Sequence, residues 1–491
     1  KPDDNLTKAI ALFKDEGKTF GVQNANHVRA IFHGLGVVSH IRTKKGGESW
    51  DKNALELVSK EHDDPEAREL ATQIVTARSL LKVLSYYSTF MELVDKDGIL
   101  HPNINQAGAR TGRMSMTEPN LQQVPKVESL AGLRSILAVT GERKRRSLAA
   151  EMASAGGKLI ALTDEEDVSA EDAKTGEVRD AFIARPGFFL LMADWSQIEP
   201  RILADLASEH EWIRAFEMGL DIYEVAAYAA YGPPPNDEKL RKWWRKLGKQ
   251  IVLGIVYGIG KNLLAKAIQR DPDEAGAFRN AFFNRYPRIS QLVERVKEKC
   301  DARRAVVGGG LGWIRDLWGR RRYLEEGENY KAPNFLIQGT AADFTKDVSN
   351  RLYIMLESAI ADEINKVSLR LKSGIIDIIH DEYIFEIAYD EAAIVIPKIM
   401  HEMTTCDRLK VPLKVDLKWS PTRWGDARDL ACDACAGSGL TYEQSAKELF
   451  TLLVKGKHEQ LDAIEGLRCA ACDGKGYNIP QEVLQHATRK L

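Results

Sequence analysis

The sequence predicts an α+β fold that is divided into several domains. Apolar residues recur at helical spacing in residues 65–95, and short apolar or β-branched runs at 188–193 and 375–387 have the length of buried strands. At roughly 100–200 residues per domain, 491 residues allow two to four domains and a sizeable core.

Composition excludes some protein classes. With 44% hydrophobic and 29% charged residues, the chain is typical of a soluble globular protein, and its apolar runs are too short to span a membrane. The net charge of −2 indicates no global affinity for nucleic acid. Six cysteines are too few for a disulfide scaffold, and four of them form two Cys-x-x-Cys pairs, which suggests metal in a reducing compartment. We therefore expect a cytoplasmic protein, at a nucleoid or a viral site, with an organelle as the alternative.

Residues 5–95 are expected to be helical, with a break at Gly46-Gly47. One buried face is predicted on Leu70, Ile74, Ala77, Leu81, Leu84 and Met91. Residues 128–178 contain the basic run 143–146 and an acidic stretch, and they are expected to form a solvated, partly disordered insertion. DNA contact through the basic run is the alternative.

Two acidic positions come at the ends of predicted strands. Residues 188–193 end at Asp194, and two β-branched runs flank His380-Asp381-Glu382, as in a hairpin with the acidic pair at its turn. Each aspartate by itself is more often a turn residue. Together, Asp194 and Asp381 could hold two Mg²⁺ ions, because divalent cations stabilise carboxylates at such positions and a two-metal site supports phosphoryl transfer.

A cationic helix is predicted around residues 239–249, which hold six basic residues and no acidic one. Arg245, Lys249, Leu253 and Tyr257 recur at steps of four and so lie along one helical stripe. An exposed charged face is the simpler interpretation. The stripe also matches a nucleoside triphosphate, which presents phosphates, then a sugar, then a base.

With these motifs in this order, the sequence resembles family A DNA polymerases, the polymerase I type. The resemblance covers about residues 5–428 outside the insertion, and it rests on Asp194–Arg201, Arg245-x₃-Lys249-x₇-Tyr257-Gly258, His380-Asp381-Glu382, Thr111–Ser115 with Pro119–Pro125, Asn334 with Gln338–Asp343, and Arg78–Tyr87.

The resemblance implies a right-hand polymerase with a helical thumb, an antiparallel-sheet palm and helical fingers. The expected segments are residues 1–100 (thumb and thumb–palm segment), 101–200 (palm with the insertion), 201–330 (fingers), 331–428 (palm) and 429–491 (zinc-binding tail). The chain would add deoxynucleotides to a primer 3′ end on a DNA template and release pyrophosphate, as a monomer, with no proofreading exonuclease in this chain.

The resemblance also implies residue roles. In catalysis, Asp194 and Asp381 would bind two Mg²⁺ ions, and Lys249 could protonate the leaving pyrophosphate. Glu382, together with His380, would position the primer end. The nucleotide-binding residues would be Arg245, Lys249, Leu253, Tyr257, Glu199 and Gln197, of which Glu199 and Tyr257 would exclude a 2′-hydroxyl. The DNA-binding residues would be Arg113, Asn120, Gln122, Asn334, Gln338, His380 and Lys82, although Lys82 could equally be a solvated helix cation.

Three positions depart from the family pattern. Leu253 stands where the family has Phe or Tyr, so we expect altered discrimination against chain terminators. Tyr223 replaces a phosphate-binding His, and Trp195 replaces a Tyr.

The tail repeats a cysteine motif. Cys432-x-x-Cys435 and Cys469-x-x-Cys472 are each followed by Gly-x-Gly, and the repeat resembles the zinc-binding region of J-protein co-chaperones. Two such pairs can close one structural Zn²⁺ site. Residues 441–467 between them are predicted to be helical. The tail's target is left open among DNA, a replication partner and the polymerase body.

The sequence disfavours three other functions. Glu199 with Tyr257 disfavours an RNA polymerase or a dedicated reverse transcriptase. The sequence argues less strongly for a DNA template over an RNA template. A non-catalytic DNA-binding scaffold is disfavoured by the complete set of acidic and basic positions. A co-chaperone is disfavoured by the small size of the tail.

Overall fold

A computed structural model describes residues 21–43, 46–124, 178–268, 271–307, 310–357, 360–362, 367–369 and 371–431. In the tail it describes 440–441, 467–469, 472, 475, 477–480 and 483. The chain forms two compact units, Lys1–His101 with Gln123–Ala181, and Pro102–Gln122 with Phe182–Leu491. Of the predicted insertion at residues 128–178, only Val178 is among the described residues. No described helix is long and apolar enough to cross a membrane.

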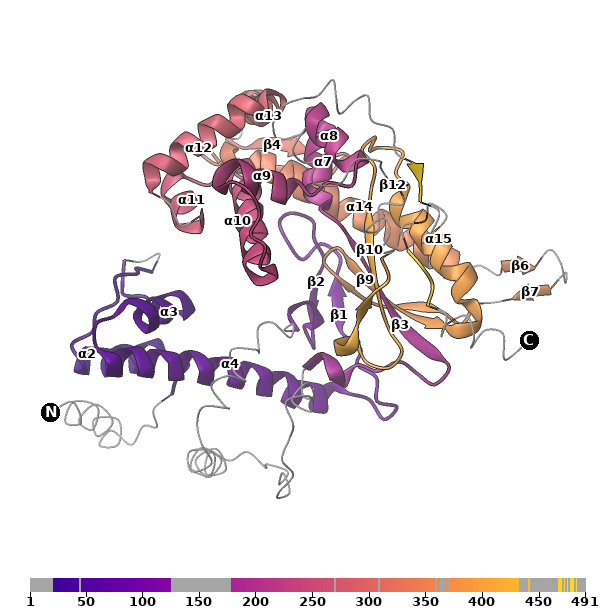
Figure 1. Cartoon of the computed structure of the whole chain (residues 1–491), viewed down its shortest axis with the longest axis horizontal. Helices are drawn as coiled ribbons and strands as arrows, with labels where there is room; N and C mark the ends of the chain where they lie inside the picture. The colour runs from indigo at the N-terminus through magenta and orange to yellow at the C-terminus, as the bar shows by residue number, and fades with distance from the viewer. Residues whose placement is uncertain are drawn as a thin grey trace, which may run out of the picture. The chain divides into compact units, whose positions relative to one another are not determined.

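The described residues of the first unit form three α-helices, α2 (Ala25–Gly34), α3 (Lys52–Glu61) and α4 (Pro65–Leu93) (Figure 1). Each begins after an Asn or Asp whose side chain accepts a hydrogen bond from a backbone N–H of the first turn. Phe32 of α2 stacks on Trp50 with ring centroids 4.5 Å apart, and both are buried in a core shared with Leu55, Ala71 and Ile74.

The predicted buried face of α4 is wrong in its second half. Ile74 is buried and Leu70 packs against the core, but Leu81, Leu84 and Met91 are 38%, 41% and 77% exposed. Helix α4 has 29 residues, and among the described residues the core formed with α2 and α3 covers only its first turns. The side chains farther along α4 therefore stay exposed.

A five-stranded antiparallel sheet forms the centre of the second unit. Its strand order is β11-β10-β3-β9-β8, with β3 at Phe188–Trp195, β8 at Gly374–Ile379, β9 at Glu382–Ala388, β10 at Val415–Ser420 and β11 at Arg428–Asp429. This confirms the predicted strand before Asp194 and the predicted hairpin, whose two-residue turn is His380-Asp381.

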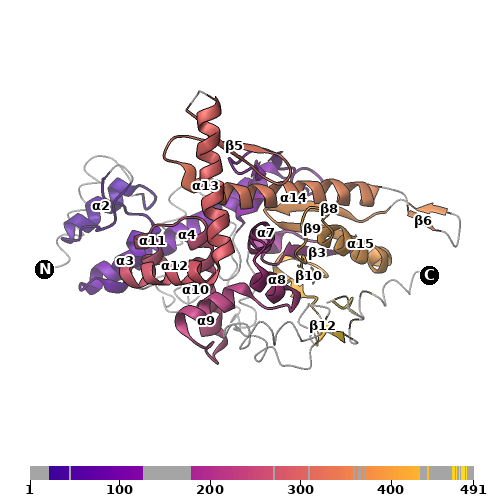
Figure 2. The same ribbon diagram turned by 90° about the horizontal axis from the view of Figure 1, so that it is seen from above.

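Two helices, α14 (Ala332–Glu357) and α15 (Ala392–Thr404), pack on one face of this sheet (Figures 1 and 2). Trp195 of β3 contacts both helices: its ring lies 4.9 Å from Phe344, and its indole N–H donates to the Met403 carbonyl at 2.8 Å. The Tyr383 hydroxyl of β9 donates to the Thr345 carbonyl at 2.6 Å. These aromatic contacts fix the strand ends relative to α14.

The other described α-helices lie between β3 and α14 in the chain. They are α7 (Ile198–Ala207), α8 (His210–Glu217), α9 (Ile222–Tyr231), α10 (Glu238–Val256), α11 (Lys261–Ile268), α12 (Pro272–Arg285) and α13 (Pro287–Val307). The predicted cationic helix is confirmed, because residues 239–249 lie within α10. Helix α10 packs closely on α9 at Gly248, where a Cβ atom would lie 1.9 Å from the Tyr223 carbonyl oxygen.

The other described strands form four two-stranded sheets: β1 (Asn103–Asn105) with β2 (Ser115–Thr117), β4 (Gly312–Arg315) with β5 (Arg321–Leu324), β6 (Ile360–Asp362) with β7 (Val367–Leu369), and β12 (Leu440–Thr441) with β13 (Leu467–Arg468). The last pair corrects the sequence prediction at its two edges, because Thr441 and Leu467 are strand residues. Residues 442–466 lie outside the described part.

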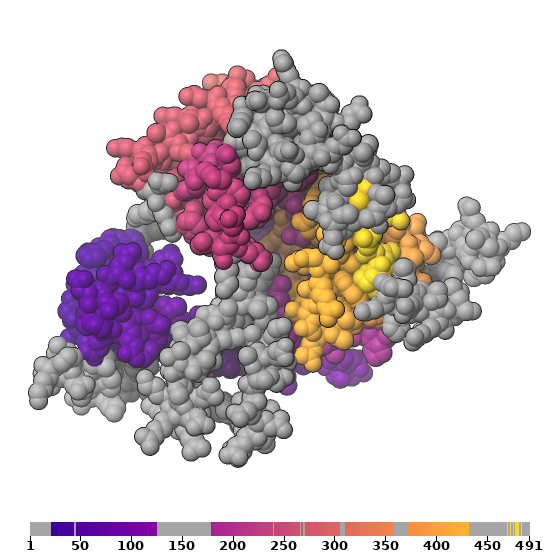
Figure 3. Space-filling model, viewed as in Figure 1, coloured from indigo at the N-terminus to yellow at the C-terminus, as the bar shows by residue number. Residues whose placement is uncertain are grey.

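The tail returns to the core of the second unit. Ala431 and Tyr477 form a backbone bridge, and the Asn478 N–H donates to the Leu430 carbonyl at 3.2 Å. Leu430, Tyr477 and Val483 are buried in the main core cluster. In Figure 3 the described tail residues, in yellow, lie against the orange part of the surface.

Candidate active site

The strand register brings the two predicted metal-binding positions to the same end of the neighbouring strands β3 and β9. Asp194 of β3 lies directly opposite Glu382 of β9, and Asp381 immediately precedes Glu382 in the hairpin turn. Directly opposite residues of an antiparallel pair have Cβ atoms about 4.5–5.5 Å apart. Asp194 and Asp381 are half-buried, so both carboxylates lie between core and solvent.

The hairpin turn has an unusual backbone. His380 has a φ of 60°, a left-handed conformation that is uncommon outside glycine but that the first position of a two-residue hairpin requires. Burial lowers the pKa of His380, and the neighbouring Arg113 charge lowers it further. The imidazole is therefore held largely neutral near pH 7.

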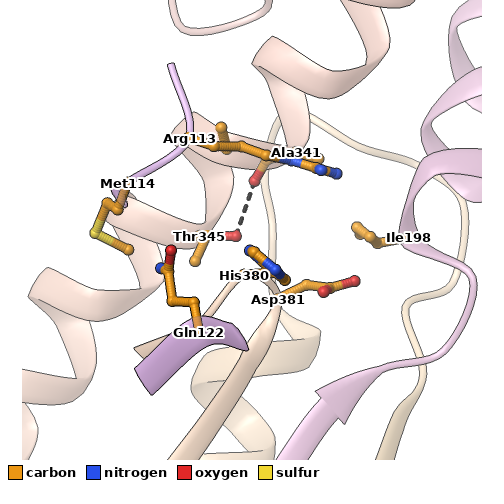
Figure 4. Close-up of a pocket in the computed structure, with 9 residues that line it drawn as sticks. Arg113, Met114, Gln122, Ile198, Ala341, Thr345, His380 and Asp381 are labelled. Atoms are coloured by element: carbon orange, nitrogen blue, oxygen red, sulfur yellow. Dashed lines mark hydrogen bonds between the residues drawn. The ribbon is translucent and has the colours of Figure 1, made fainter. Parts of the chain in front are cut away.

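Arg113, His380 and Asp381 line a cavity in the second unit (Figure 4). Its other lining residues are Met114, Gln122, Ile198, Ala341, Ala342 and Thr345. The middle of α14 forms one wall, and there the Thr345 hydroxyl donates to the Ala341 carbonyl at 2.9 Å. Four residues predicted from the sequence, Arg113, Gln122, His380 and Asp381, thus line one cavity.

Glu199 connects this cavity to α7 and α10. Its carboxylate accepts a hydrogen bond from Arg113. Burial raises the pKa of Glu199, the Arg113 charge opposes that rise, Asp381 adds to it and Lys249 lowers it. Asp381 and Lys249 are therefore each close enough to Glu199 to act on its charge.

The cations of the α10 stripe contact Asp221 and Tyr223, and the sequence did not predict the pairing with Asp221. Arg245 Nε donates to Asp221 Oδ2 at 2.7 Å, and Asp221 also caps α9 by accepting from the Tyr223 N–H at 2.8 Å. The Tyr223 ring lies 5.3 Å from the Arg245 guanidinium and 5.7 Å from Lys249 Nζ. Tyr223 is therefore a buried aromatic platform beside both cations.

The other two stripe residues differ in burial. Leu253 is half-buried and packs against the main core. Tyr257 lies at the C-cap of α10, and its hydroxyl is buried without a hydrogen-bond partner among the described residues. A buried hydroxyl without a partner is unfavourable, so this group would gain from a polar ligand atom.

The remaining predicted residues have structural contacts of their own. Gln197 begins α7 and accepts from the Ile222 N–H at 3.2 Å, and Asn120 accepts from the Gln122 N–H at 3.2 Å. In α14, Gln338 is half-buried, and Asn334 Oδ1 is buried without a hydrogen-bond partner among the described residues. Lys82 lies exposed on α4 in the first unit.

The predicted zinc ligands are only partly described. Cys432 and Cys435 lie outside the described residues, whereas Cys469 and Cys472 are buried together.

The acidic pair fits Mg²⁺ by its chemistry. Mg²⁺ prefers oxygen ligands and is usually bound by one or two carboxylates together with water and substrate phosphates. Within the described ranges, no group of three or more His, Cys, Asp or Glu side chains is arranged to hold a metal ion. Asp194 and Asp381 would therefore need substrate and water oxygens as further ligands.

Sequence reasoning missed residues whose contacts depend on the fold. Besides Asp221, these include Arg201, which is 3% exposed and donates to the Ser196 carbonyl at 2.8 Å. Burial lowers the pKa of Arg201 to about 10. Aspartate directly before a helix is a signal for a cap, but nothing in the sequence indicates that this cap also pairs with Arg245.

Comparison with known proteins decides the family. A family model described as "DNA polymerase family A" matches residues 4–426. The chain belongs to this family. The match ends where the cysteine-containing tail begins, so the tail lies beyond the part that the family model describes.

Several curated relatives of this family A chain are DNA polymerases. It is 28% identical over 437 residues to DNA polymerase I of Chloroflexus aurantiacus, covering 86% of this chain and 39% of the relative. It is also 28% identical over 420 residues to the thermostable DNA polymerase I of Thermus aquaticus, covering 83% of this chain and 42% of the relative. The chain thus spans about two fifths of the length of these relatives.

A solved structure shares the fold. The POL domain of Pol1 from M. smegmatis, in complex with DNA primer-template and dNTP, aligns with a TM-score of 0.60 and 24% identity, covering 87% of this chain and 64% of that one. This similarity supports the polymerase-domain fold of the family A chain.

Proposed function

We propose that this chain is a template-directed DNA polymerase that adds deoxynucleotides to a primer 3′ end and releases pyrophosphate. The observation that carries the proposal is the convergence of Asp194 and Asp381 at one end of the neighbouring strands β3 and β9. Lys249 of the cationic helix and Asp381 both act on the charge of Glu199. The curated relatives are named DNA polymerase I, and the structural neighbour was solved with DNA primer-template and dNTP.

In the proposed reaction the primer 3′-oxygen forms a bond to the α-phosphorus, the bond from that phosphorus to the bridging oxygen breaks, and pyrophosphate leaves. Asp194 and Asp381 would hold two Mg²⁺ ions, which supply charge neutralisation for the attacking and leaving oxygens. Glu382, opposite Asp194, would help to orient the primer end with His380. Lys249 would donate a proton to the leaving pyrophosphate.

Arg245 and Lys249 would bind the triphosphate. Arg245 is paired with Asp221, so an incoming triphosphate has to compete with one carboxylate for this guanidinium. Tyr223 lies beside both cations and would keep them oriented toward the phosphates. We propose that exchange of Asp221 for phosphate at Arg245 accompanies nucleotide binding. An Asp221→Asn variant keeps the helix cap and removes the competing charge, so its nucleotide Kd should fall; an unchanged or higher Kd would contradict the exchange.

Sugar selection would depend on Glu199, Leu253 and Tyr257. The buried Glu199 and the Tyr257 ring would close the space beside the sugar 2′ position, and Gln197 would support the start of α7. Leu253 has no ring to place against the sugar. We therefore expect rejection of ribonucleotides together with altered discrimination at the 3′ position.

Duplex contacts would come from residues around the cavity and on α14. Arg113, Asn334 and Gln338 would reach minor-groove acceptors, which are similar in all base pairs and so report pairing geometry without sequence. Arg113 would have to share its guanidinium with Glu199. Asn120 and Gln122 would support the template–primer loop. Lys82 would contact the duplex backbone.

We propose in addition that Cys432, Cys435, Cys469 and Cys472 hold one structural Zn²⁺ ion. In support, Cys469 and Cys472 are 1% and 4% exposed, and the Leu440–Arg468 register brings the chain just after the first cysteine motif beside the second. Because Tyr477 and Val483 pack on the core, the polymerase body is the proposed target of the tail, ahead of DNA or a replication partner.

One set of assays tests the polymerase proposal. Primer extension should require Mg²⁺ and template, should use dNTPs in preference to rNTPs, and should be lost in Asp194→Ala and Asp381→Ala. Asp429→Asn, an exposed aspartate on the edge strand β11, is the control and should retain activity. Extension by Asp381→Ala, or a wild type that binds DNA without extending it, would overturn the proposal. Efficient use of rNTPs or of RNA templates would instead assign a different polymerase class.

Metal analysis tests the tail proposal. The purified chain should contain one Zn²⁺ per molecule, and Cys469→Ser/Cys472→Ser should contain none. Cys406→Ser, a half-buried thiol elsewhere in the second unit, is the matched control. Equal zinc content in all three proteins would refute the assignment of the metal to the tail.

A further inference from the structure

One face of the β4–β5 hairpin carries only aromatic and arginine side chains. Trp313 lies directly opposite Tyr323, and Arg315 directly opposite Arg321. Because opposite residues of an antiparallel pair share a face, these four side chains lie together. The other face packs inward, since Ile314 and Leu324 are 4% and 1% exposed. Figure 2 shows the hairpin beside the C-terminal part of α13.

Helix α13 adds a third arginine to this face. The guanidinium carbons of Arg303, Arg321 and Arg315 lie 3.9, 4.7 and 5.6 Å from the Trp313 ring centroid. Arg303 also donates to the Trp313 carbonyl at 3.2 Å. One indole ring therefore holds three guanidinium groups by cation–π attraction.

These arginines form no ion pair within the described part of the chain, although carboxylates are near in sequence. Asp301 pairs with Arg304, and Glu328 pairs with Lys331. Glu325 and Glu326, which follow β5, form no ion pair with the three arginines. Three gathered like charges repel one another, so an anion that bridges them would relieve that repulsion.

We propose that this arginine–aromatic face (Arg303, Trp313, Arg315, Arg321 and Tyr323) binds an unpaired nucleic-acid strand outside the polymerising centre. The arginines take successive phosphates. The Tyr323 side chain, 47% exposed, stacks on a base, which is how sequence-independent single-strand sites combine charge with aromatic rings. None of these five residues lines the cavity that contains Asp381. The choice of nucleic acid over another polyanion rests on the proposed function.

The test is fluorescence anisotropy of a labelled oligothymidylate of about 12 nucleotides with the full chain, in the presence of saturating unlabelled primer–template. Arg315→Ala/Arg321→Ala should weaken binding and reduce the slope of log K against log salt by about 1.4, as expected for two lost phosphate contacts to a single strand. The control Arg423→Ala/Arg428→Ala removes the same charge from two exposed arginines elsewhere and should bind as the wild type does.

Substitutions at Tyr323 distinguish the contribution of base stacking to binding from that of charge. Tyr323→Ala should weaken binding about 5- to 150-fold without changing the salt slope, and Tyr323→Phe should bind as the wild type does. Wild-type binding by the double arginine variant, or equal losses in the control pair, would overturn the proposal. Failure of the polymerase function would appear separately, as absent primer extension by the wild type.

Discussion

The close packing of α9 on α10 predicts that a glycine-to-alanine substitution destabilises the chain at Gly248 and stabilises it at Gly276. Gly248→Ala would place a Cβ atom 1.9 Å from the Tyr223 carbonyl oxygen, whereas ordinary contacts begin near 3.4 Å. The helices would have to separate by about 1.5 Å, the difference between these two values. Since the obstructing atom belongs to the backbone, no side-chain rotation relieves the clash.

The expected magnitude follows from two opposing terms. Alanine favours a helix interior over glycine by about 1 kcal/mol, while overpacking a close contact costs about 1–3 kcal/mol and more when backbone must move. We expect Gly248→Ala to destabilise the second unit by about 1–2 kcal/mol and to lower its thermal midpoint by several degrees. Displacing Tyr223 would also disturb Asp221 and Arg245, so the nucleotide KM should rise.

Gly276→Ala in α12 is the matched control. At that position the nearest heavy atom to a new Cβ is the flexible Lys261 side chain at 4.0 Å. The same substitution should therefore stabilise the chain by about 0.5–1 kcal/mol. Thermal and urea unfolding of both variants, followed with nucleotide kinetics, tests the reasoning. If Gly248→Ala raised the midpoint as Gly276→Ala does, the close approach of α9 and α10 would be refuted.

Three further predictions concern selection, pH and metal. Leu253→Tyr should change dideoxynucleotide discrimination in primer extension; equal discrimination in both proteins would show that this position does not sense the sugar. Burial raises the pKa of Asp377 to about 6, with the Glu382 charge adding to it, so its protonated form favours folding below pH 4 and this contribution is lost as pH rises through about 6. The free energy of unfolding of Asp377→Asn should therefore match that of the wild type near pH 4 and exceed it by about 2 kcal/mol at pH 8. A difference that stays constant across that pH range would contradict the assignment. Chelation of zinc should lower the unfolding midpoint of the wild type because Tyr477 packs on the core, and should leave Cys469→Ser/Cys472→Ser unaffected.

Local patterns were sufficient for the parts of the site that depend on near neighbours in the chain. The apolar run before Asp194 is strand β3, the β-branched runs around His380-Asp381 form the β8–β9 hairpin, and the basic stripe lies on α10. Strand alternation, turn geometry and helical spacing operate over a few residues, so the sequence reveals them directly.

Contacts between distant segments were not predictable in the same way. Arg113 and Glu199 are 86 residues apart in the sequence. Their pairing depends on how α7, which carries Glu199, lies against the segment just before β2, which carries Arg113. The pairing of Arg245 with Asp221 depends on the fit of Gly248 against α9. The apolar stripe of α4 was correctly identified as helical, but its periodicity carried no information on how far α2 and α3 extend along it.

The sequence by itself determined the family resemblance, the acidic strand ends and the cationic helix, because each is written in residue types at short spacing. Only the tertiary structure decided which charges neutralise one another, which half of α4 is covered and that the tail returns to the core through Tyr477 and Val483. Those outcomes depend on the burial of surfaces contributed by remote parts of the chain, and burial is a property of the whole fold.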